Sequence, residues 1–501
     1  MVSDAAQQLG FSSKAEVLAK SEEFWNPGKT RFWVSSGVDL VIDRREGYFL
    51  HDMSGKRLID VHLNGGTYNL GHRNLEVVRA VTAAMEHFDI GNHHFPSMAR
   101  TALAEALVRT APAGLTKVVY ASGGGEAIDI ALKTARHTTQ KRKIVSVIKA
   151  YHGHTGLAVN TGDERFSRLF LSDAPEEFPH VPFNDLEAME AALRGHDVAA
   201  VVMETIPATY GFPLPEPGYL PTVKALCERY DALYIADEVQ TGLMRTGELW
   251  AITKHGVTPD ILVTGKGISG GMYPIAAVLL SERCAGWLTE DGFAHMSTFG
   301  GAELGCVAAL KALEICNRPE TRSLVHYIAD FMGRGLRDVQ TAFPDWFVGI
   351  RQEGVVMGLE FDHPQGASCV MRRLYEGGVW AIFSTLDPRV LQYKPGILMP
   401  AELCEELLMR TGTAIGRARD DAVRDGWRAP TRITGRTSAR TADQPPPHVS
   451  SARPSSRPHG SAVRQDAGGA YVTTTSGRRV PVRTTTPGRQ SAAGAPPAAT
   501  R

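Results

Sequence analysis

Short, nearly unbroken apolar runs alternate with stretches of helical periodicity over the first 430 residues of the chain. Several of these runs are four to six residues long, which is typical of parallel strands that are buried on both faces. The predicted strands are 117–120, 144–148, 198–203, 233–236, 261–263 and 275–280, and the helical patterns between them include 126–137, 186–193 and 219–230. This alternation predicts an α/β domain with a largely parallel sheet.

Further predicted elements flank this α/β region. Turn signals at 45–47 and 53–55 divide residues 37–60 into a small β-meander, and the region 347–361 reads as additional strands before a closing helix over 401–423. We therefore expect four parts in chain order. They are an N-terminal segment with the meander (1–65), a large α/β domain (66–320), a small α+β domain (321–430) and a tail (431–501).

The tail differs in composition from the rest of the chain. Residues 431–501 contain eleven arginines, two aspartates and no lysine or glutamate, and they lack Leu, Met, Phe, Trp and Cys. Such a segment cannot bury enough apolar surface to offset its ordering entropy, so we expect disorder. The pattern favours a solvated appendage, and it leaves open a basic tail that contacts an acidic partner or a reading frame that departs from the natural C-terminus.

Composition narrows the class of protein. The chain is 43% apolar and 22% charged, with a formal net charge of zero, so its charge suggests neither a nucleic-acid nor a membrane partner. No apolar run reaches the roughly 18–20 residues that span a bilayer, and the N-terminus does not resemble a secretory signal. The six cysteines form no CxxC pair, which argues against disulfides and a metal site and favours the cytoplasm.

Candidate chemistry gathers at the predicted strand ends. The segment SGGGEA (122–127) follows one strand and opens a helix, so its backbone N–H groups form a candidate phosphate cradle, although it matches neither GxGxxG nor a Walker loop. Tyr151 and His152 follow the next strand, where an aromatic side chain is placed to stack on a flat ligand. Taken singly, these segments equally fit an ordinary turn and a packed aromatic residue.

Two more strand ends carry charged residues. Asp237 and Glu238 come directly after the apolar run 233–236, where buried acids are costly unless they hold a metal, a base or a protonated heterocycle. Lys266 stands in TGKG after 261–263, and desolvation there would lower its pKa and make it a nucleophile toward a carbonyl. Thr298 lies in a glycine-rich loop that precedes another helix. Taken singly, the acids and the lysine could equally be solvated surface charges, and the threonine could be an ordinary turn residue.

In combination these features indicate one cofactor. A phosphate cradle, an aromatic platform, a strand-end acid and a strand-end lysine occur in that order along one predicted sheet. Pyridoxal 5′-phosphate (PLP) requires this set, because the lysine forms a Schiff base, the acid keeps the pyridine nitrogen protonated and the cradle holds the phosphate.

The motifs resemble those of the class III aminotransferases of PLP fold type I over about residues 20–425. The similar segments are GKRLIDVHLNGG with YNLGH, SGGGEAIDIALKTAR, AYHGHT, ADEVQTGLMRTG, PDILVTGKGISGGMYP and STFGGAELGC. The most specific is the DExQTG block with a lysine 29 positions after its Asp. The resemblance implies a large domain with a mostly parallel seven-stranded sheet and a smaller α+β domain built from the N- and C-terminal segments.

The resemblance also implies a role for each cofactor residue. Lys266 would be the Schiff-base lysine and the acid/base that moves the substrate proton. Asp237 would pair with the pyridine nitrogen and Gln240 with the phenolic oxygen of the ring. Tyr151, with His152 beside it, would stack on the ring.

Phosphate binding would extend to a second subunit. Gly124 and Gly125 would donate backbone N–H groups to the phosphate, and Glu126 would support their loop. Thr298 would reach the phosphate held by the neighbouring subunit, so the resemblance implies a homodimer with active sites at the interface.

The departures from the family pattern concern the substrate. The usual Glu-Pro after the central strand is Glu204-Thr205 here, which leaves Glu204 as a free acid that could attract a substrate amine. Gln392 stands where many members place an arginine for the substrate carboxylate, and an amide cannot make that charged fork. Acetylornithine-type members carry an arginine at the position of His154. These departures therefore argue against acetylornithine, ornithine and 4-aminobutyrate as the amino donor.

Three interpretations of the donor remain. In the first, Lys394 shares the strand face of Gln392 and binds a substrate carboxylate. In the second, Arg389 binds that carboxylate instead, although its odd spacing places it on the opposite face. In the third, the donor amine is remote from any carboxylate, and the uncharged Gln392 favours this interpretation. Arg245 is a candidate for the carboxylate of the oxo acid. The predicted activity is transfer of an amino group between an amine or amino acid and a 2-oxo acid in ping-pong half-reactions. A PLP-dependent decarboxylase, or a racemase or epimerase, is the alternative.

Overall fold

The computed structural model describes residues 4–428, 464–466, 469–473 and 479–481 of the 501-residue chain. The chain divides into two units, Met1–Thr431 and Arg432–Arg501. The boundary between these units falls next to the predicted start of the tail. The boundaries expected at residues 65 and 320 stay predictions.

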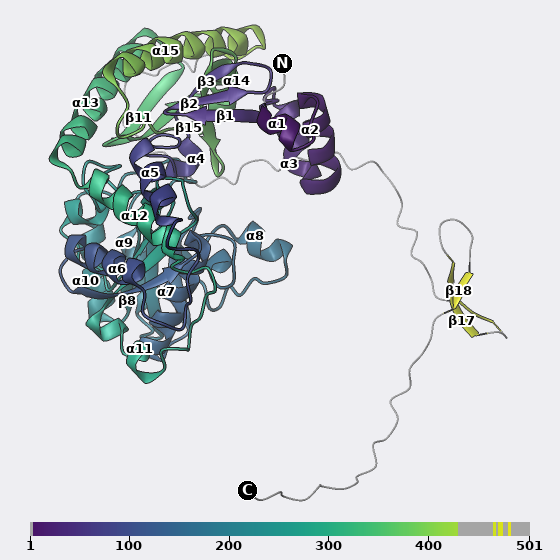
Figure 1. Ribbon diagram of the computed structural model, residues 1–501. Coiled ribbons are helices and arrows are strands. Elements are labelled where there is room, and N and C mark those ends of the chain that lie inside the picture. The colour runs from purple at the N-terminus through teal and green to yellow at the C-terminus, as the bar shows by residue number, and fades with distance from the viewer. Residues whose placement is uncertain (1–3, 429–463, 467–468, 474–478, 482–501) are drawn as a thin grey trace, which may run out of the picture. The chain divides into compact units, whose positions relative to one another are not determined.

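A seven-stranded sheet forms the centre of the first unit (Figure 1). Only β10 runs antiparallel to its neighbours, β4 and β9, and the other pairs are parallel, which confirms the mostly parallel sheet. In spatial order the strands are β4 (Leu115–Ala121), β10 (Ala276–Ser281), β9 (Ile261–Thr264), β8 (Leu233–Asp237), β7 (Val198–Glu204), β5 (Lys143–Val147) and β6 (His180–Val181).

The two faces of this sheet belong to two separate apolar cores. Along β8, Leu233 and Ile235 join the core that includes α7 (Gly124–Thr139), and Tyr234 and Ala236 join the core on the opposite face. This alternation follows from the two-residue period of a strand, and both faces are buried because helices cover them. The nearly unbroken apolar runs in the sequence have this origin.

The remaining helices of the large domain pack around the sheet. They are α5 (Leu75–Ala84), α6 (Met98–Thr110), η2 (Ala158–Thr161), α8 (Glu164–Leu169), α9 (Leu186–Leu193), α10 (Tyr219–Arg229), η3 (Ala251–His255), η4 (Lys266–Ser269), η5 (Glu282–Cys284), α11 (Trp287–Glu290) and α12 (Glu303–Cys316). Nine of the fourteen residues of α12 are buried, and this helix packs on α5 and α6. The predicted helices 126–137, 186–193 and 219–230 correspond to α7, α9 and α10.

The small domain joins segments from both ends of the first unit. The meander forms β1 (Ile42–Glu46), β2 (Phe49–Asp52) and β3 (Arg57–Asp60), and β3 pairs in parallel with β13 (Val379–Trp380). This pairing confirms a small domain built from the N- and C-terminal segments. A second sheet has the order β11 (Phe347–Glu353), β12 (Val356–Phe361), β15 (Asp387–Tyr393) and β14 (Ile382–Ser384).

Long helices cover the second sheet (Figure 1). They are α13 (Pro319–Ala342), α14 (Gly366–Glu376) and α15 (Ala401–Arg424), of which α15 is the predicted closing helix. Four short N-terminal helices were not predicted and lie to one side: α1 (Asp4–Gln8), α2 (Lys14–Lys20), η1 (Ser21–Trp25) and α3 (Pro27–Ser35). A further short helix, α4 (Leu63–Gly66), has left-handed backbone at Asn64 and Gly65.

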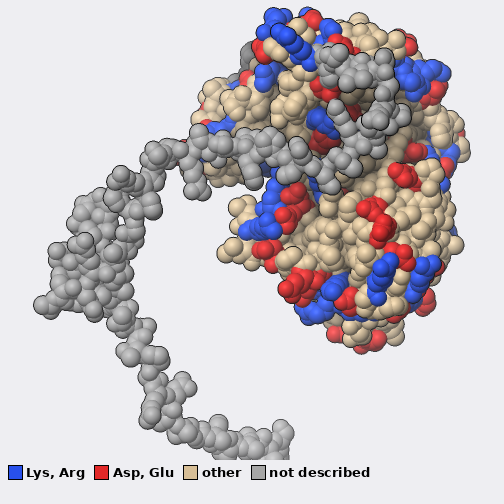
Figure 2. All heavy atoms as spheres, turned by 180° about the vertical axis from the view of Figure 1, so that it is seen from behind, with Lys and Arg blue, Asp and Glu red and all other residues tan. Residues whose placement is uncertain are grey.

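Within the segment expected to be disordered, the structure describes three short antiparallel strands, β16 (Arg464–Asp466), β17 (Gly469–Thr473) and β18 (Arg479–Pro481). The rest of 431–501 lies outside the described residues. On the face of the first unit seen in Figure 2, basic and acidic side chains are interspersed. None of the helices in the described part of the chain is long and apolar enough to cross a membrane.

Candidate active site

The carboxyl ends of three adjacent parallel strands bring the predicted charged residues together. Glu204 ends β7, Asp237 ends β8 directly opposite it, and Lys266 follows β9 by two residues. Together with the start of α7 these ends enclose a cavity of about 160 Å³. Its walls are formed by Gly124, Gly125, Ile128, Tyr151, His152, Gly153, Glu204, Asp237, Val239, Gln240 and Lys266.

Asp237 is buried and held by two hydrogen bonds. Its Oδ2 lies 2.7 Å from Nδ1 of His152, and its Oδ1 accepts the N–H of Val239 at 3.0 Å. The Nε2 of His152 is also buried, and it has no hydrogen-bond partner. The carboxylate is therefore oriented by the imidazole and the backbone, while His152 keeps one polar atom for a ligand.

Lys266 is half-buried and has a left-handed backbone conformation, with φ of 44°. Burial lowers the pKa of its amino group, and the negative charges of Asp237 and Glu204 act in the opposite direction. A lysine with a lowered pKa has more of the neutral amine that attacks a carbonyl. This is the electrostatic setting that the sequence predicted for TGKG.

The loop before α7 packs closely enough to explain its glycines. A Cβ on Gly125 would lie 2.8 Å from Oγ1 of Thr155, and a Cβ on Gly124 would lie 3.3 Å from Cγ1 of Val239. Glu126 accepts hydrogen bonds from both the backbone N–H and the hydroxyl of Ser122. The start of α7 is thus a supported loop whose backbone N–H groups are free of side-chain caps.

These residues fit an aromatic heterocycle that carries a phosphate. Asp237 supplies an acceptor for a ring N–H, and the buried Nε2 of Gln240 has no partner and can donate to a ring oxygen. Tyr151 is part-exposed at 38% and lies at the cavity wall. The start of α7 supplies the anion site. The donor set therefore matches PLP on observations of this structure.

Glu204 differs from the expectation of a free acid. Its Oε1 accepts the N–H of Tyr151 at 3.0 Å, and its Oε2 accepts the N–H of Ala208 at 3.1 Å. Burial raises its pKa to about 6. Glu238 is more fully bonded still, because it accepts from Thr205, Thr241 and two backbone N–H groups. Both acids thus hold backbone or side chains around the cavity.

One segment at the site was missed by the sequence reasoning. A Cβ on Gly65 would lie 3.3 Å from Cε of Lys266, and a Cβ on Gly66 would lie 3.0 Å from Nε of Arg245. The α4 segment therefore packs directly against Lys266. Its signal was the Gly-Gly pair, since close backbone approach requires residues without a side chain.

Several predicted residues lie outside the cavity wall. Thr298 is exposed in the loop before α12. Gln392 and Lys394 are buried at the end of β15, and Nζ of Lys394 donates to Oε1 of Gln392 at 2.6 Å. The two side chains thus meet, although Lys394 lies one residue past the end of β15. Arg245 is fully buried and donates to the carbonyl oxygens of Gly66 and Pro395.

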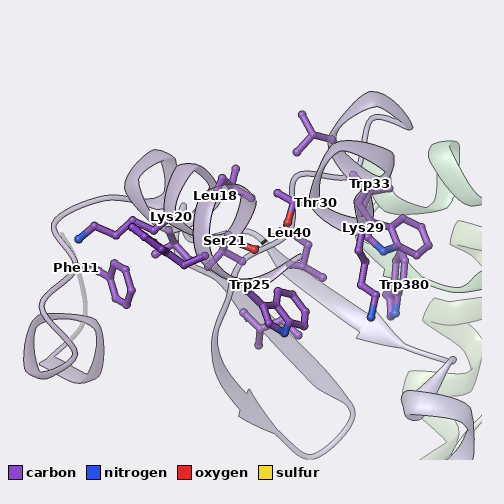
Figure 3. Close-up of a pocket in the computed structure, with 16 residues that line it drawn as sticks. Phe11, Leu18, Lys20, Ser21, Trp25, Lys29, Thr30, Trp33, Leu40 and Trp380 are labelled. Atoms are coloured by element: carbon purple, nitrogen blue, oxygen red, sulfur yellow. Dashed lines mark hydrogen bonds between the residues drawn. The ribbon is translucent and has the colours of Figure 1, made fainter. Parts of the chain in front are cut away.

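A larger hollow of about 680 Å³ lies elsewhere, among α2, η1, α3 and β1 (Figure 3). Its wall is mostly aromatic and aliphatic, with Trp33 and Trp380 in edge contact at 5.5 Å. Lys20 and Lys29 are its charged members, and it contains no acid. It has no acid–base pair for catalysis, so the chemistry belongs to the cavity at the strand ends.

The comparisons with known proteins agree with this geometry. The model of the family "Aminotransferase class-III" matches residues 34–415, which include every element of the site. The chain belongs to the class III aminotransferases. It is 41% identical over 394 residues to an uncharacterized aminotransferase of Archaeoglobus fulgidus, covering 78% of this chain and 92% of that protein.

Solved structures of other aminotransferases have the same fold. Ornithine aminotransferase from Toxoplasma gondii is 25% identical with a TM-score of 0.76, and the match covers 83% of this chain and 98% of that one. A transaminase from a marine Virgibacillus is also 25% identical, with a TM-score of 0.74 over 81% and 99% of the two chains. A second T. gondii structure, 25% identical with a TM-score of 0.71 over 82% and 99%, records PLP at its active site.

The expected fold and activity are thus confirmed. This aminotransferase has the PLP fold type I, its cofactor is PLP, and it catalyses transamination. The identity of its amino donor is a separate question, because the family includes enzymes for different donors, such as ornithine and N-acetylornithine.

Proposed function

We propose that Lys266 binds PLP covalently and that the cavity at the strand ends is the site of amino-group transfer. PLP supplies an electron-accepting ring that stabilises the negative charge left when a substrate Cα–H bond breaks. The observation that carries the proposal is the convergence of Lys266, Asp237, Gln240 and the start of α7 on one enclosed cavity.

The protein residues would divide the work. Asp237, oriented by His152, holds a proton at the ring nitrogen, and Gln240 donates to the ring oxygen. Gly124 and Gly125 bind the phosphate through backbone N–H groups. Tyr151 shields one face of the ring from water. Lys266, once its amine is free, moves the proton at the substrate Cα, since its lowered pKa favours reversible protonation.

The test of this assignment is chemical labelling. Borohydride reduction of the holoenzyme followed by peptide mapping should place the label on Lys266, and Lys266→Ala should retain PLP without a covalent bond and lose turnover. Lys254→Ala, at a lysine outside the cavity, is the control. A label on another lysine would contradict the assignment. One oxo acid consumed per amine released separates transamination from decarboxylation and racemisation.

We further propose that the active unit is a homodimer. Several large apolar side chains are exposed on two segments beside the site, and the rings of His94 and Phe293 bring these segments together at 6.2 Å. The exposed residues are Met85, Phe95, Met98, Phe293, Met296 and Phe299. A patch of this kind is typical of a subunit interface. It also contains Thr298, whose proposed phosphate contact requires a neighbouring subunit.

Light scattering of the holoenzyme tests the dimer. The double variant Met296→Asp and Phe299→Asp should be monomeric and should bind PLP more weakly. Thr298→Ala should stay dimeric and should raise the dissociation constant of PLP. A monomeric wild type with full activity would refute the proposal.

We also propose a cytoplasmic location. The six cysteines are all free, which supports this location, and cell fractionation tests it.

A further inference from the structure

Lys394 is a buried amine without an acidic partner, and burial lowers the pKa of its amino group well below the usual range, as do the positive charges of Arg245 and Lys266. Its side chain is fully buried, its Nζ donates to Gln392, and it lies 5.3 Å from the ring centroid of Phe212. Among the described residues, no carboxylate lies within ion-pair distance of this Nζ. An ammonium group has three N–H donors, so two are left for a ligand.

The position of Lys394 connects it to the cofactor cavity. Gln392, its partner, donates to the carbonyl of Ala208, and the N–H of Ala208 binds Glu204, which lines the cavity. The backbone N–H of Lys394 donates to Val61 at 2.8 Å, immediately before His62. Lys394 therefore lies where the end of β15 meets the segment that packs on the cofactor lysine.

The pKa of His62 is affected both by Lys394 and by Lys266. Burial lowers the pKa of its imidazole well below the usual range, and the positive charges of Lys394, Lys266 and Arg245 lower it further. Its Nδ1 is buried and has no hydrogen-bond partner. The basic groups of Lys394, Lys266 and Arg245 thus lie close enough to His62 to act on its pKa.

Asp60 is the acid whose charge acts on Lys394, and its carboxylate already has hydrogen-bond partners. Asp60 attracts its charge, but the oxygens of Asp60 accept from His72 at 2.9 Å and from the N–H groups of His62 and Leu63. Arg245 likewise contacts backbone carbonyls only. Burying an ammonium without an opposite charge is unfavourable, and the pKa of Lys394 is lowered for this reason. A bound anion would raise this pKa again and stabilise the ammonium.

The other interpretations of the donor are less well supported. Arg389 is half exposed and forms ion pairs with Asp387 and Glu360, so its guanidinium is already paired at the surface. The amide of Gln392 is bonded at both ends, to Lys394 and to Ala208, so it orients the ammonium and is not free to read a hydroxyl. A donor without a carboxylate would leave Lys394 unpaired.

We propose that Lys394, oriented by Gln392, binds the carboxylate of the amino donor, which makes the donor an amino acid and not a simple amine. The inference rests on the proposed function of the cavity. It replaces the preference for a remote amine that the uncharged Gln392 suggested from the sequence alone.

The test compares two probes that react with PLP and differ in one group. Aminooxyacetate carries a carboxylate and O-methylhydroxylamine does not, and each forms an oxime with the holoenzyme that absorbance can follow. Wild type should react faster with aminooxyacetate. In Lys394→Met this preference should fall by about 10- to 100-fold, the loss expected for a charged hydrogen bond, and Lys394→Arg should keep part of it.

A matched lysine provides the control. Lys56 lies over the ring of Tyr375 at 3.8 Å, so Lys56→Met makes the same change away from the site and should leave the preference unchanged. Melting temperatures verify that both variants are folded. The second arm compares L-ornithine with 1,4-diaminobutane, and L-alanine with ethylamine, in single turnovers, where Lys394→Met should again lower the ratio.

The outcomes separate the two proposals. If neither probe forms an oxime, the proposed cofactor site is wrong. If both react and Lys394→Met has the same preference as wild type, the carboxylate inference is wrong. If Lys394→Met slows only the reaction of pyruvate with the amino form of the holoenzyme, the lysine reads the acceptor, and the inference is again overturned.

Discussion

The imidazole of His152, in the loop after β5, and the carboxylate of Asp237, at the end of β8, are joined by a 2.7 Å hydrogen bond between buried side chains. The two residues are 85 positions apart in sequence. Because a carboxylate can only accept, Nδ1 of His152 must donate when Asp237 is ionised. One carboxylate oxygen is thereby fixed by a side chain and the other by the N–H of Val239, which leaves remaining lone pairs for a ring N–H.

The first prediction concerns Asp237. Asp237→Asn should keep the fold and lower the rate of the amino-donor half-reaction on the order of 100-fold or more, because a neutral amide cannot hold a proton at the ring nitrogen. Single-turnover absorbance measures the rate. Asp231→Asn, which changes a surface acid paired with Arg283, should leave the rate at the wild-type value. An active Asp237→Asn would mean that this acid is structural.

The second prediction concerns the loop before α7. Gly125→Ala should raise the dissociation constant of PLP at least tenfold, because the new Cβ would come within 2.8 Å of Oγ1 of Thr155 and displace the backbone N–H groups. Gly123→Ala is the matched control, since a Cβ there meets nothing within 4 Å. Fluorescence titration of the cofactor-free protein with PLP gives both constants. Equal effects at the two positions would argue against a cradle.

The third prediction follows from the raised pKa of Glu204. Burial raises this pKa from 4.5 to about 6, so the folded state binds the proton more tightly than the unfolded state. This contribution to stability is therefore present at low pH and is lost as pH rises through the interval from 4.5 to about 6. The loss corresponds to about 2 kcal/mol.

Glu204→Gln removes this titration. The free energy of unfolding of the cofactor-free variant, relative to that of wild type, should therefore rise by about 2 kcal/mol between pH 4.5 and pH 7. Urea unfolding at several pH values measures the difference and cancels the titration of all other groups. A difference that is independent of pH would show that the carboxyl of Glu204 titrates normally.

The fourth prediction separates the tail from the folded chain. Trp427 donates its indole N–H to the carbonyl of Asp362 and lies in edge contact with Trp346, so the fold extends three residues past α15. A chain that ends at residue 430 should melt and turn over like the full chain. A chain that ends at residue 426 loses Trp427 and should be less stable by about 2 kcal/mol. Reduced activity of the 430-residue chain would assign the tail a role.

Local sequence patterns identified the residues proposed to bind the cofactor, because these residues lie at the ends of strands. Asp237 and Lys266 follow apolar runs, and adjacent parallel strands end at the same edge of a sheet, so sequence order alone brings these residues together. The glycines before α7 were found for the same reason. Two-residue strands such as β6 and the polar N-terminal helices escaped because their patterns are too short or too weakly periodic.

The substrate side was less predictable because it depends on contacts between distant segments. The approach of Gly65 to Lys266 spans about 200 residues of sequence and requires the small domain to pack on the large one. The bonds of Glu204 to Tyr151 and Ala208 likewise depend on loop conformations that no periodicity encodes. The sequence predicted Gln392 and Lys394 on one strand face, and the side chains do meet, although β15 ends at Tyr393. It could not show that Lys394 lacks an acidic partner.

The joining of the two domains at α4 has a practical consequence for changing this enzyme. The residues proposed to hold the cofactor lie at or just after the ends of strands in the central sheet, whereas Lys394, Gln392 and His62 come from the small domain and its entry segment. If the proposed roles hold, a library restricted to those three positions should vary the choice of donor and keep the cofactor in place. The fold thus offers a natural boundary between what an engineer should leave alone and what can be randomised.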